Sequence, residues 1–477
     1  MPLIEAGILS QAVRQRLYAI RPLVQEYQRE LPDTAWQNFI EGINTLLDLA
    51  ECFHAEAVAR CKSTLKHDAI ANERDLSLHS KVALRFLANI HQSLLPFLQK
   101  GTQRAEYLLL PTIQRIVSRH AESAQVVLLP DFDFNYGYLG LKEFAPEQIE
   151  KFEPYLPTHK VNEFKERAKK LCKWNVFLQY PISESESALN LCVLTHELSH
   201  FFDHHEELYK KYLPQKLDEG SFKALVDKRC GMTISEPGQM TMEVVFSRAT
   251  IQNNTYKQCI SLIEKWLREI IADVLAVHAL GPAYFFSLVE YFAHAASENS
   301  PASTHPAMAI RLKLLVEELE NLGYLDMEGP LKDILTSSAR SARSEAETTK
   351  HEEEALVAYE TIKSHLPTIQ EKLRDLASSF AYVAERYKEE VPPIIPLLLK
   401  GVAPVEHLNP GQGTCEPNNP VAIVNAGWEV YKTRYVEFKS IFWDRMSDPE
   451  ALANLNQMLL KAVEASEVVQ RWPKEQG

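Results

Sequence analysis

The chain has 477 residues, which is enough for two to four domains or for one large decorated domain. Acidic residues outnumber basic ones and give a formal net charge of −13, which argues against a general nucleic-acid-binding protein because phosphates need a basic surface. Glycine is scarce, with 16 residues or roughly 3% against an average near 7%, so turn-rich barrels, propellers and sandwiches are disfavoured and long helices are favoured.

Apolar residues recur at helical spacing through the N-terminal segment. Each stripe predicts a helix with one buried face. The three stripes are Val13, Leu17, Ile20 and Val24; Trp36, Ile40, Ile43 and Leu47; and Val82, Phe86, Ile90 and Leu94. These stripes predict stacked helices in the N-terminal part of the chain.

The middle of the chain mixes strand and helix signals. Residues 125–140 and 175–180 are rich in valine and aromatic residues and predict short strands. Residues 187–202 predict a helix, and residues 256–291 predict another that is interrupted at Gly281-Pro282. The intervening residues 206–255 have mixed signals and are expected to form a helix and a long loop.

The C-terminal part begins with a polar stretch. Residues 336–350 are small, polar and charged and predict a linker or a mobile loop. From Leu366 to Tyr387 apolar residues alternate at spacings of three and four, which favours helix pairing within the chain over dimerisation. Residues 403–420 are expected to form a turn-rich loop.

The cysteines and the hydropathy indicate a compartment. Seven cysteines are present, an odd number, and no two have the CxxC spacing, so a disulfide framework and a cysteine zinc knuckle are both disfavoured. The N-terminal residues lack the basic-then-apolar order of a signal peptide, and no stretch reaches about 18 uninterrupted apolar residues. We therefore expect a cytoplasmic protein without an integral membrane segment.

The most informative stretch is an HExxH motif at residues 196–200 on a predicted helix. His196 and His200 are one turn apart on the same face, so their imidazoles can bind one zinc ion at about 2.0–2.1 Å. Glu197 lies beside them, where its carboxylate can take a proton from a zinc-bound water. The apolar run before the motif favours a buried catalytic helix over a surface helix that carries two histidines.

A catalytic zinc site needs a third protein ligand. The HExxHxxGxxH pattern is excluded because Asp203 and Glu206 stand where that pattern has glycine and histidine. His204 lies one turn beyond His200, and three ligands from consecutive turns of a straight helix converge poorly on one ion. A supporting or surface role is therefore favoured for His204.

A later helix offers a better third ligand. Residues 266–278 are strongly apolar, yet Glu269 and Asp273 lie four apart on one face of this predicted helix. Buried carboxylates are costly unless they are paired or coordinated. Glu269 could complete the zinc site, and Asp273 could accept the other ring N–H of a liganding histidine. The alternative is a pair of solvated acids near Arg268.

An HExxH motif followed by ExxxD on a later helix resembles the gluzincin pattern of thermolysin-like metallopeptidases. Residues 303–306, STHP, with Arg311 six residues after His305, are similar to the [ST]-H-P…R segment of the CAAX prenyl protease and HtpX group. The resemblance covers residues 185–320. It implies that His305 stabilises the oxyanion or binds substrate and that Arg311 supports the site electrostatically. Members of that group commonly carry transmembrane helices or export signals, so their membrane role and prenylated substrates are not carried over.

Together these patterns predict a mainly α (α+β) fold in four parts. An N-terminal helical region spans residues 1–122, and a helical zincin-type metallopeptidase core with a small β-sheet spans residues 123–335. The linker or mobile loop at residues 336–350 leads to a C-terminal helical region at residues 351–477. The two terminal regions are where a protein partner could bind.

The motifs predict a zinc-dependent peptidase. Its zinc ion would be held by His196, His200 and Glu269, and a water activated by Glu197 would attack a bond in a peptide or protein substrate. One alternative is a helical interaction or regulatory scaffold with a structural or vestigial zinc site, which would have four protein ligands. Another is a latent peptidase blocked by its own residues 206–255.

Overall fold

A computed structural model describes most of the chain. The described residues are 2–31, 34–63, 69–96, 98, 125–131, 136–140, 149–150, 152–171, 175–233, 242–294, 305–409, 414–441 and 446–475. The chain divides into two compact units, Met1–Ser183 and Glu184–Gly477, which are treated separately below. Both units are mainly helical, and each contains a small sheet.

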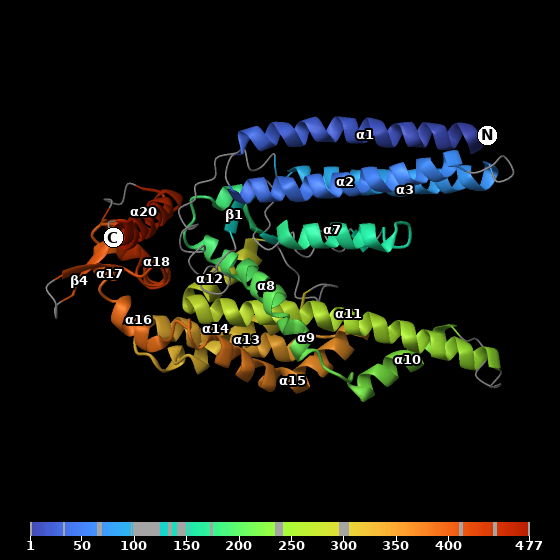
Figure 1. The fold of residues 1–477 in the computed structure, drawn as a ribbon. Coiled ribbons are helices and arrows are strands. Elements are labelled where there is room, and N and C mark those ends of the chain that lie inside the picture. The colour runs from blue at the N-terminus through green and yellow to red at the C-terminus, as the bar shows by residue number, and fades with distance from the viewer. Residues whose placement is uncertain are drawn as a thin grey trace. The chain divides into compact units, whose positions relative to one another are not determined.

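The first unit combines long helices with a short mixed sheet (Figure 1). Its principal described elements are α1 (Pro2–Glu30), α2 (Thr34–Ser63), α3 (Ala69–Ser93), β1 (Gln125–Asp131), β2 (Gly137–Gly140), α7 (Thr158–Leu171) and β3 (Asn175–Pro181). Helices α1, α2 and α3 lie alongside one another, and α7 packs against α2. Strand β3 is central, parallel to β1 and antiparallel to β2, which confirms the predicted strands.

The helices and the sheet of the first unit share one apolar core. The three predicted stripes face this core, with Val82 only partly buried. The ring of Phe39 on α2 lies 4.6 Å from that of Phe177 on β3, and Trp36 lies 5.5 Å from the same ring. Because the sheet packs directly on α2, the compact unit continues past the predicted boundary at residue 122 and includes all three strands.

The second unit is larger. It begins with short 3-10 turns at Ile182–Glu184, across the boundary, and at Asn190–Val193 (η3). Its described helices and strands are α8 (Leu194–Glu206), α9 (Leu208–Tyr212), α10 (Glu219–Thr233), α11 (Met242–Leu280), α12 (Pro282–His294), α13 (Met308–Asn321), α14 (Pro330–Thr348), α15 (Glu353–Ala377), α16 (Ala384–Glu390), α17 (Ile395–Leu398), β4 (Glu406–Asn409), β5 (Thr414–Pro417), α18 (Pro420–Thr433), α19 (Tyr435–Ser440) and α20 (Asp448–Glu475). A third 3-10 turn, Tyr324–Asp326, connects α13 to α14.

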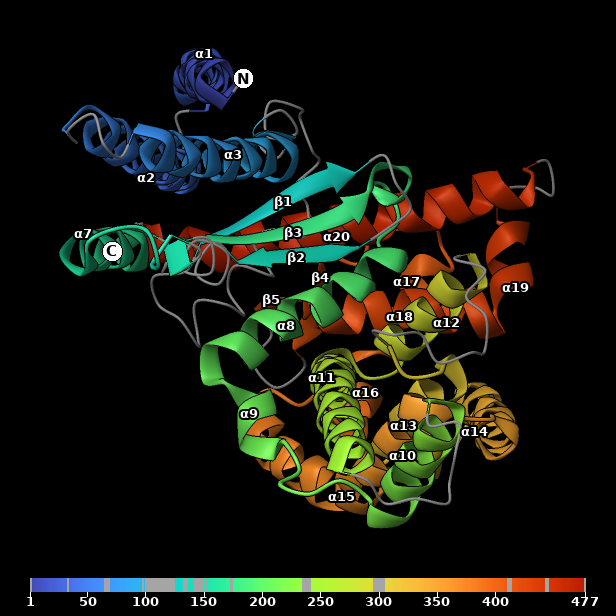
Figure 2. The same ribbon diagram turned by 90° about the vertical axis from the view of Figure 1, so that its right-hand side faces the viewer.

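Helix α11 is the centre of the second unit. It is 39 residues long, and α8 and α15 pack on opposite sides of it, as Figure 2 shows. Helices α12 and α13 also contact α11. From Ile270 to Val277 every residue is buried, which a helix tolerates only when neighbours cover it on all sides. Polar side chains in that stretch must therefore find partners inside the protein.

Two predictions for the C-terminal part are wrong. Residues 336–350 are not a linker, because α14 runs through Thr348 and buries a narrow face made largely of alanine. Residues 403–420 contain the antiparallel hairpin β4–β5 as well as turns. The apolar pattern from Leu366 to Tyr387 is divided between α15, which ends at Ala377, and α16. The predicted pairing within the chain is confirmed, because α15 packs on α11. The helices after residue 351 thus belong to the same compact unit as α8 and α11.

Two further sequence features can be compared with the described residues. No described helix combines the length and the apolar character that crossing a membrane requires. Cys52, Cys61, Cys192, Cys230 and Cys259 are free thiols.

The predicted interruption at Gly281-Pro282 separates α11 from α12. Gly281 has φ of +61°, and its amide donates to the carbonyl of Val277 at 2.7 Å, which ends α11. Pro282 then starts α12, a position where a proline costs no hydrogen bond. A Cβ at position 281 would lie 2.5 Å from the hydroxyl of Tyr324, so the turn requires glycine for both its backbone angle and its space.

We therefore expect Gly281→Ala to lower the free energy of unfolding by about 2 kcal/mol, since a left-handed alanine alone costs about 1–2 kcal/mol. Gly231→Ala is the matched control, because Gly231 lies in α10 with open space around its Cα. That variant should gain up to about 1 kcal/mol. Urea unfolding followed by circular dichroism measures both, and equal stability of the two variants would contradict the strained turn.

Candidate metal centre

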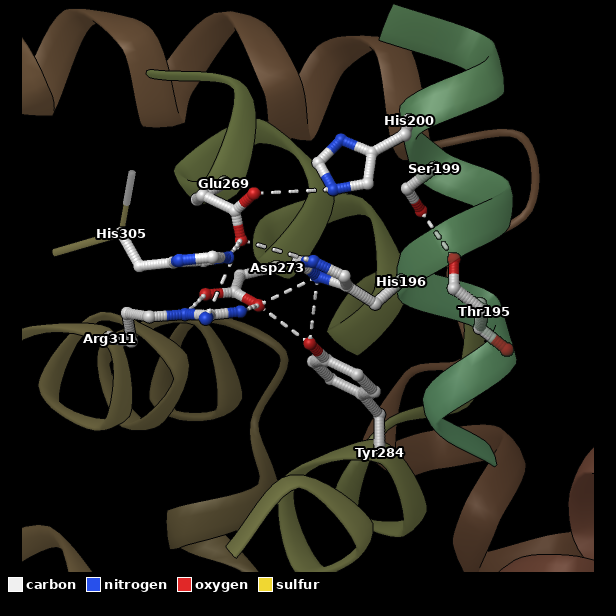
Figure 3. A network of polar contacts seen from close by, with 9 residues as sticks. All are labelled: Thr195, His196, Ser199, His200, Glu269, Asp273, Tyr284, His305 and Arg311. Atoms are coloured by element: carbon white, nitrogen blue, oxygen red, sulfur yellow. Dashed lines mark hydrogen bonds and ion pairs between the residues drawn. The ribbon is translucent and has the colours of Figure 1, made fainter. Parts of the chain in front are cut away.

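Helix α8 carries the HExxH motif and is anchored by its apolar face. Leu194, Leu198 and Phe201 recur at helical spacing and are buried. The residues between them place His196 and His200 on another face, toward α11 (Figure 3). The rings of the two histidines are 4.7 Å apart, so they lie side by side one turn apart. The sequence prediction that both imidazoles share one face is therefore confirmed.

Helix α11 presents Glu269 to the two histidines. The distance from His196 Nε2 to Glu269 Oε2 is 3.3 Å, and that from His200 Nε2 to Glu269 Oε1 is 3.4 Å. The Glu269 side chain is only 12% exposed. The ligand atoms of these three residues all lie within 4.8 Å of one another, which makes the group a site that could hold a metal ion.

The nitrogen–oxygen separations suit a tetrahedral ion. Two donor atoms that are each about 2.0–2.1 Å from such an ion lie about 3.3 Å apart, which is close to the separation of each histidine Nε2 from the Glu269 oxygen that it contacts, Oε2 for His196 and Oε1 for His200. Glu269 Oε2 is buried and makes no hydrogen bond of ordinary geometry among the described residues, although His196, His305 and Arg311 each bring a nitrogen to within 3.3–3.5 Å of it. A buried carboxylate oxygen without a close hydrogen bond is costly unless a cation completes it. The donor set and this buried oxygen therefore both suit a bound cation.

Asp273, one turn after Glu269 on α11, holds the other side of His196. Its Oδ1 lies 3.0 Å from His196 Nδ1, on the opposite edge of the ring from Glu269. Arg311 on α13 donates to both Asp273 oxygens, from Nε at 2.7 Å and from Nη2 at 2.8 Å. A proton on Nδ1 leaves Nε2 free to coordinate a metal, so this contact selects the histidine tautomer that a metal needs.

Tyr284 on α12 completes the cluster around Asp273. Its hydroxyl donates to Asp273 Oδ1 at 2.6 Å and lies 3.2 Å from His196 Nδ1. Burial, and then the charge of Asp273, raise the pKa of Tyr284 well above its ordinary value, so the hydroxyl keeps the proton that it donates. Figure 3 shows the hydroxyl pointing toward both His196 and Asp273.

The two carboxylates stay ionised despite their burial. Burial would raise the pKa of Glu269, but its close contacts with His196 and His200 and the charge of Arg311 hold it well below its ordinary range. The same competition lowers the pKa of Asp273, where Arg311 is the strongest opposing influence. Burial lowers the pKa of His196, yet the two carboxylates outweigh it and raise that pKa to about 10. The two carboxylates therefore favour a positive charge at the His196 ring, which is either a second ring proton or, in its place, a cation bound at Nε2.

Glu197, His305 and Tyr291 border the centre. Glu197 is partly exposed on α8, and together with burial its charge raises the pKa of Tyr291 on α12. The His305 side chain is half-exposed, with Nε2 3.5 Å from Glu269 Oε2. Burial lowers the pKa of His305 more than Glu269 raises it, which favours a neutral imidazole. Ser303 and Thr304 of the STHP segment lie outside the described residues.

Neither alternative ligand on α8 joins the metal group. His204 Nε2 lies 2.8 Å from Nη1 of Arg268, whose guanidinium stacks over Tyr209 at 3.9 Å. Asp203 Oδ1 accepts from the Tyr209 amide at 2.8 Å and thereby caps α9. The structure thus gives His204 and Asp203 partners of their own, and the described metal group has three protein ligands.

Most of the predicted site residues come together in the structure, namely His196, His200, Glu269, Asp273, His305 and Arg311. Glu197 is the neighbour of His196 in sequence on α8. The buried Arg311 guanidinium pairs with Asp273, stacks on Phe292 at 5.2 Å and is 3.5 Å from Glu269 Oε2 through Nη1. Tyr284 was not predicted from the sequence, because a tyrosine in an apolar helix is ordinarily a core residue and no spacing rule connects it to the motif.

Comparison of the chain with protein-family models, with curated proteins and with solved structures finds no match. The geometry and chemistry of the site residues are therefore the basis for assigning a function.

We expect Glu269→Gln to weaken binding of a divalent metal at least about tenfold, because the amide lacks the charge that balances the cation. Glu264→Gln, on the same helix but outside the metal group, is the matched control and should bind metal like the native chain. Competition with a chromophoric chelator measures both affinities. Equal affinity of the two variants would exclude Glu269 as a ligand.

Tyr284→Phe should weaken metal binding by about tenfold, the lower end of the usual effect of removing a partner of a liganding histidine. The ring still fills its buried site, so the loss reports on the hydroxyl contacts with Asp273 and His196. Isothermal titration with zinc gives the affinity. An unchanged dissociation constant would show that Arg311 alone suffices to orient Asp273.

Proposed function

We propose that this chain is a zinc-dependent peptidase with a zincin-type core of the gluzincin kind. The observation that carries the proposal is the buried group of His196, His200 and Glu269, whose first histidine is held by Asp273 on its other nitrogen. A HExxH helix and a later ExxxD helix meet at this point, as the resemblance to thermolysin-like metallopeptidases implies. The same resemblance supports the assignment of the reaction.

Zinc is the metal that this donor set favours. Two imidazole nitrogens and one carboxylate are the ligands of one large class of catalytic zinc sites. Three protein ligands leave a position for water or substrate, whereas a structural site ordinarily has four. The three-ligand group therefore supports a catalytic centre over the scaffold alternative.

In the proposed reaction the metal ion, Glu197 and His305 each have a separate role in peptide hydrolysis. A zinc ion held by the group supplies Lewis acidity that polarises a carbonyl and lowers the pKa of water. Glu197 takes a proton from the attacking water as its oxygen bonds to the carbonyl carbon, and passes that proton to the amine as the C–N bond breaks. We assign to His305, whose Nε2 lies 3.5 Å from Glu269 Oε2 beside the metal group, the role of donating to the oxygen that gains negative charge.

The supporting residues keep this arrangement rigid. Asp273 holds the Nδ1 proton of His196, so that Nε2 stays available. Arg311 neutralises Asp273 and leaves Glu269 as the carboxylate whose charge faces the cation. Because these side chains are buried and already oriented, they need little reorientation when charge develops on the reacting substrate.

Glu197→Gln should retain zinc within about twofold, since Glu197 is outside the metal group, but should lose at least about a hundredfold in peptide hydrolysis. Cleavage of a fluorogenic peptide library and zinc content by mass spectrometry measure the two properties. Chelation should abolish hydrolysis by the native chain, and added zinc should restore it.

The matched control is Glu206→Gln, an exposed acid at the end of the same helix, which should cleave like the native chain. Undiminished cleavage by Glu197→Gln of a substrate that the native chain cleaves would refute the mechanism.

A further inference from the structure

The metal centre depends on the turn between α11 and α12. Helix α11 carries Glu269 and Asp273, and α12 carries Tyr284 three residues after the break at Gly281. The carbonyl of Leu280 and the amide of Ala283 flank this break, where helix ends leave backbone groups without partners inside their own helices. A side chain that forms hydrogen bonds with this carbonyl and this amide therefore also fixes where α12 begins. It thereby fixes the position of the Tyr284 hydroxyl.

Asn425 on α18 satisfies both groups. Its Nδ2 donates to the carbonyl of Leu280 at 2.8 Å, and its Oδ1 accepts from the amide of Ala283 at 3.0 Å. The same Nδ2 donates to Val421 on its own helix at 2.9 Å, so both amide protons are used and the side-chain orientation is determined. Asn425 is 1% exposed, so water cannot replace these bonds.

Helices α12 and α18 stay in register beyond this contact, and Figure 2 shows them side by side. Phe286 lies three residues after Ala283, and its ring is 5.7 Å from that of Trp428, three residues after Asn425. Four residues further along each helix there is a third contact, in which Lys432 Nζ lies 2.8 Å from Glu290 Oε1. The spacings are the same on both helices, so α18 determines the axial position of α12.

The C-terminal helices also reach the start of α8. Asn456 on α20 accepts at Oδ1 from the amide of Leu189 at 3.1 Å, just before η3 and α8. Helix α18 approaches Leu189 and Leu459 so closely at Gly427 that a Cβ there would collide with Leu459. Helices α18 and α20 therefore contact both the segment that leads to His196 and the helix that carries Tyr284.

We propose that Asn425 is a positioning residue of the metal centre, which acts by fixing the α11–α12 turn and thereby the contact of Tyr284 with Asp273 and His196. The proposal rests on the metal centre of the proposed function but does not require peptide hydrolysis. It assigns the C-terminal α18 a part in a site whose ligands lie more than 150 residues earlier.

The test is the zinc dissociation constant of the full chain, measured well below the unfolding temperature so that only native protein is titrated. Asn425→Ala should weaken zinc binding about three- to tenfold, because it releases the turn while leaving every ligand in place. Asn418→Ala is the matched control. It removes another buried amide, which donates to Pro404 at 2.9 Å, and should lower the melting temperature without changing zinc affinity.

A second pair of variants covers the case in which Asn425→Ala fails to fold. Lys432→Met removes the other register contact at a partly exposed position and should weaken zinc binding about twofold to threefold. Lys439→Met breaks a comparable ion pair, 2.6 Å to Asp448, away from α12 and should leave zinc affinity unchanged. Equal zinc affinity of Lys432→Met and the native chain would contradict the inference that α18 determines the axial position of α12.

Coupling to Tyr284 separates positioning from simple destabilisation. If Asn425 acts through Tyr284, the double variant with Tyr284→Phe should lose less affinity than the product of the two single losses. Fully multiplicative losses, or native affinity in Asn425→Ala, would overturn the proposal. A native chain that binds no zinc would overturn the metal centre and this proposal together, whereas zinc binding without peptide cleavage would contradict only the proposed reaction.

Discussion

An ionised carboxylate in the fully buried C-terminal part of α11 is the constraint on which the second unit depends. Asp273 is 0% exposed, and an unpaired charge at such a depth would cost several kcal/mol. Three side chains from different elements contact this carboxylate and compensate its charge: Arg311 of α13, Tyr284 of α12 and His196 of α8. The requirement to compensate one carboxylate therefore ties those three elements to α11, and the metal group forms where they meet.

The two acids on α11 have opposite surroundings although they are one turn apart. Asp273 receives hydrogen bonds on both oxygens, two of them from one guanidinium. Glu269 Oε2 makes no close hydrogen bond in the described part of the chain and has only the longer contacts, 3.3–3.5 Å, with His196, His305 and Arg311. This difference gives each acid a distinct function in the proposed centre. The saturated carboxylate orients a histidine, and the unsaturated one retains the charge and the lone pairs that a metal requires.

The contacts that support the metal group extend into the later part of the second unit. Four elements hold the ligands and their direct partners, yet the turn between α11 and α12 is satisfied by Asn425 from a helix much later in the chain. Helix α14 packs on α13, and α13 carries Arg311. Residues 184–335 alone would lose these supports. The C-terminal helices are accordingly part of the scaffold of the proposed active centre.

Local patterns predicted much of the helical structure. The stripes that include Leu17, Ile40 and Phe86 are buried, and the break at Gly281-Pro282 is where it was expected. Residues 336–350 were misjudged because their buried face consists of small residues that resemble a linker, although Ala339, Ala342 and Ala346 recur at helical spacing. The β4–β5 hairpin was missed because its strands are only four residues long.

By itself, the sequence determined the pair of histidines on one helical face and the carboxylates one turn apart on another, because helix periodicity relates residues that are close in the chain. It also singled out His305 and Arg311 through their resemblance to a family pattern. Only the tertiary structure decided that Arg311 serves Asp273, that Tyr284 joins the cluster, and that Asn425 secures the turn between them. Those contacts join segments far apart in sequence, and their distances depend on how whole helices pack, which no local spacing specifies.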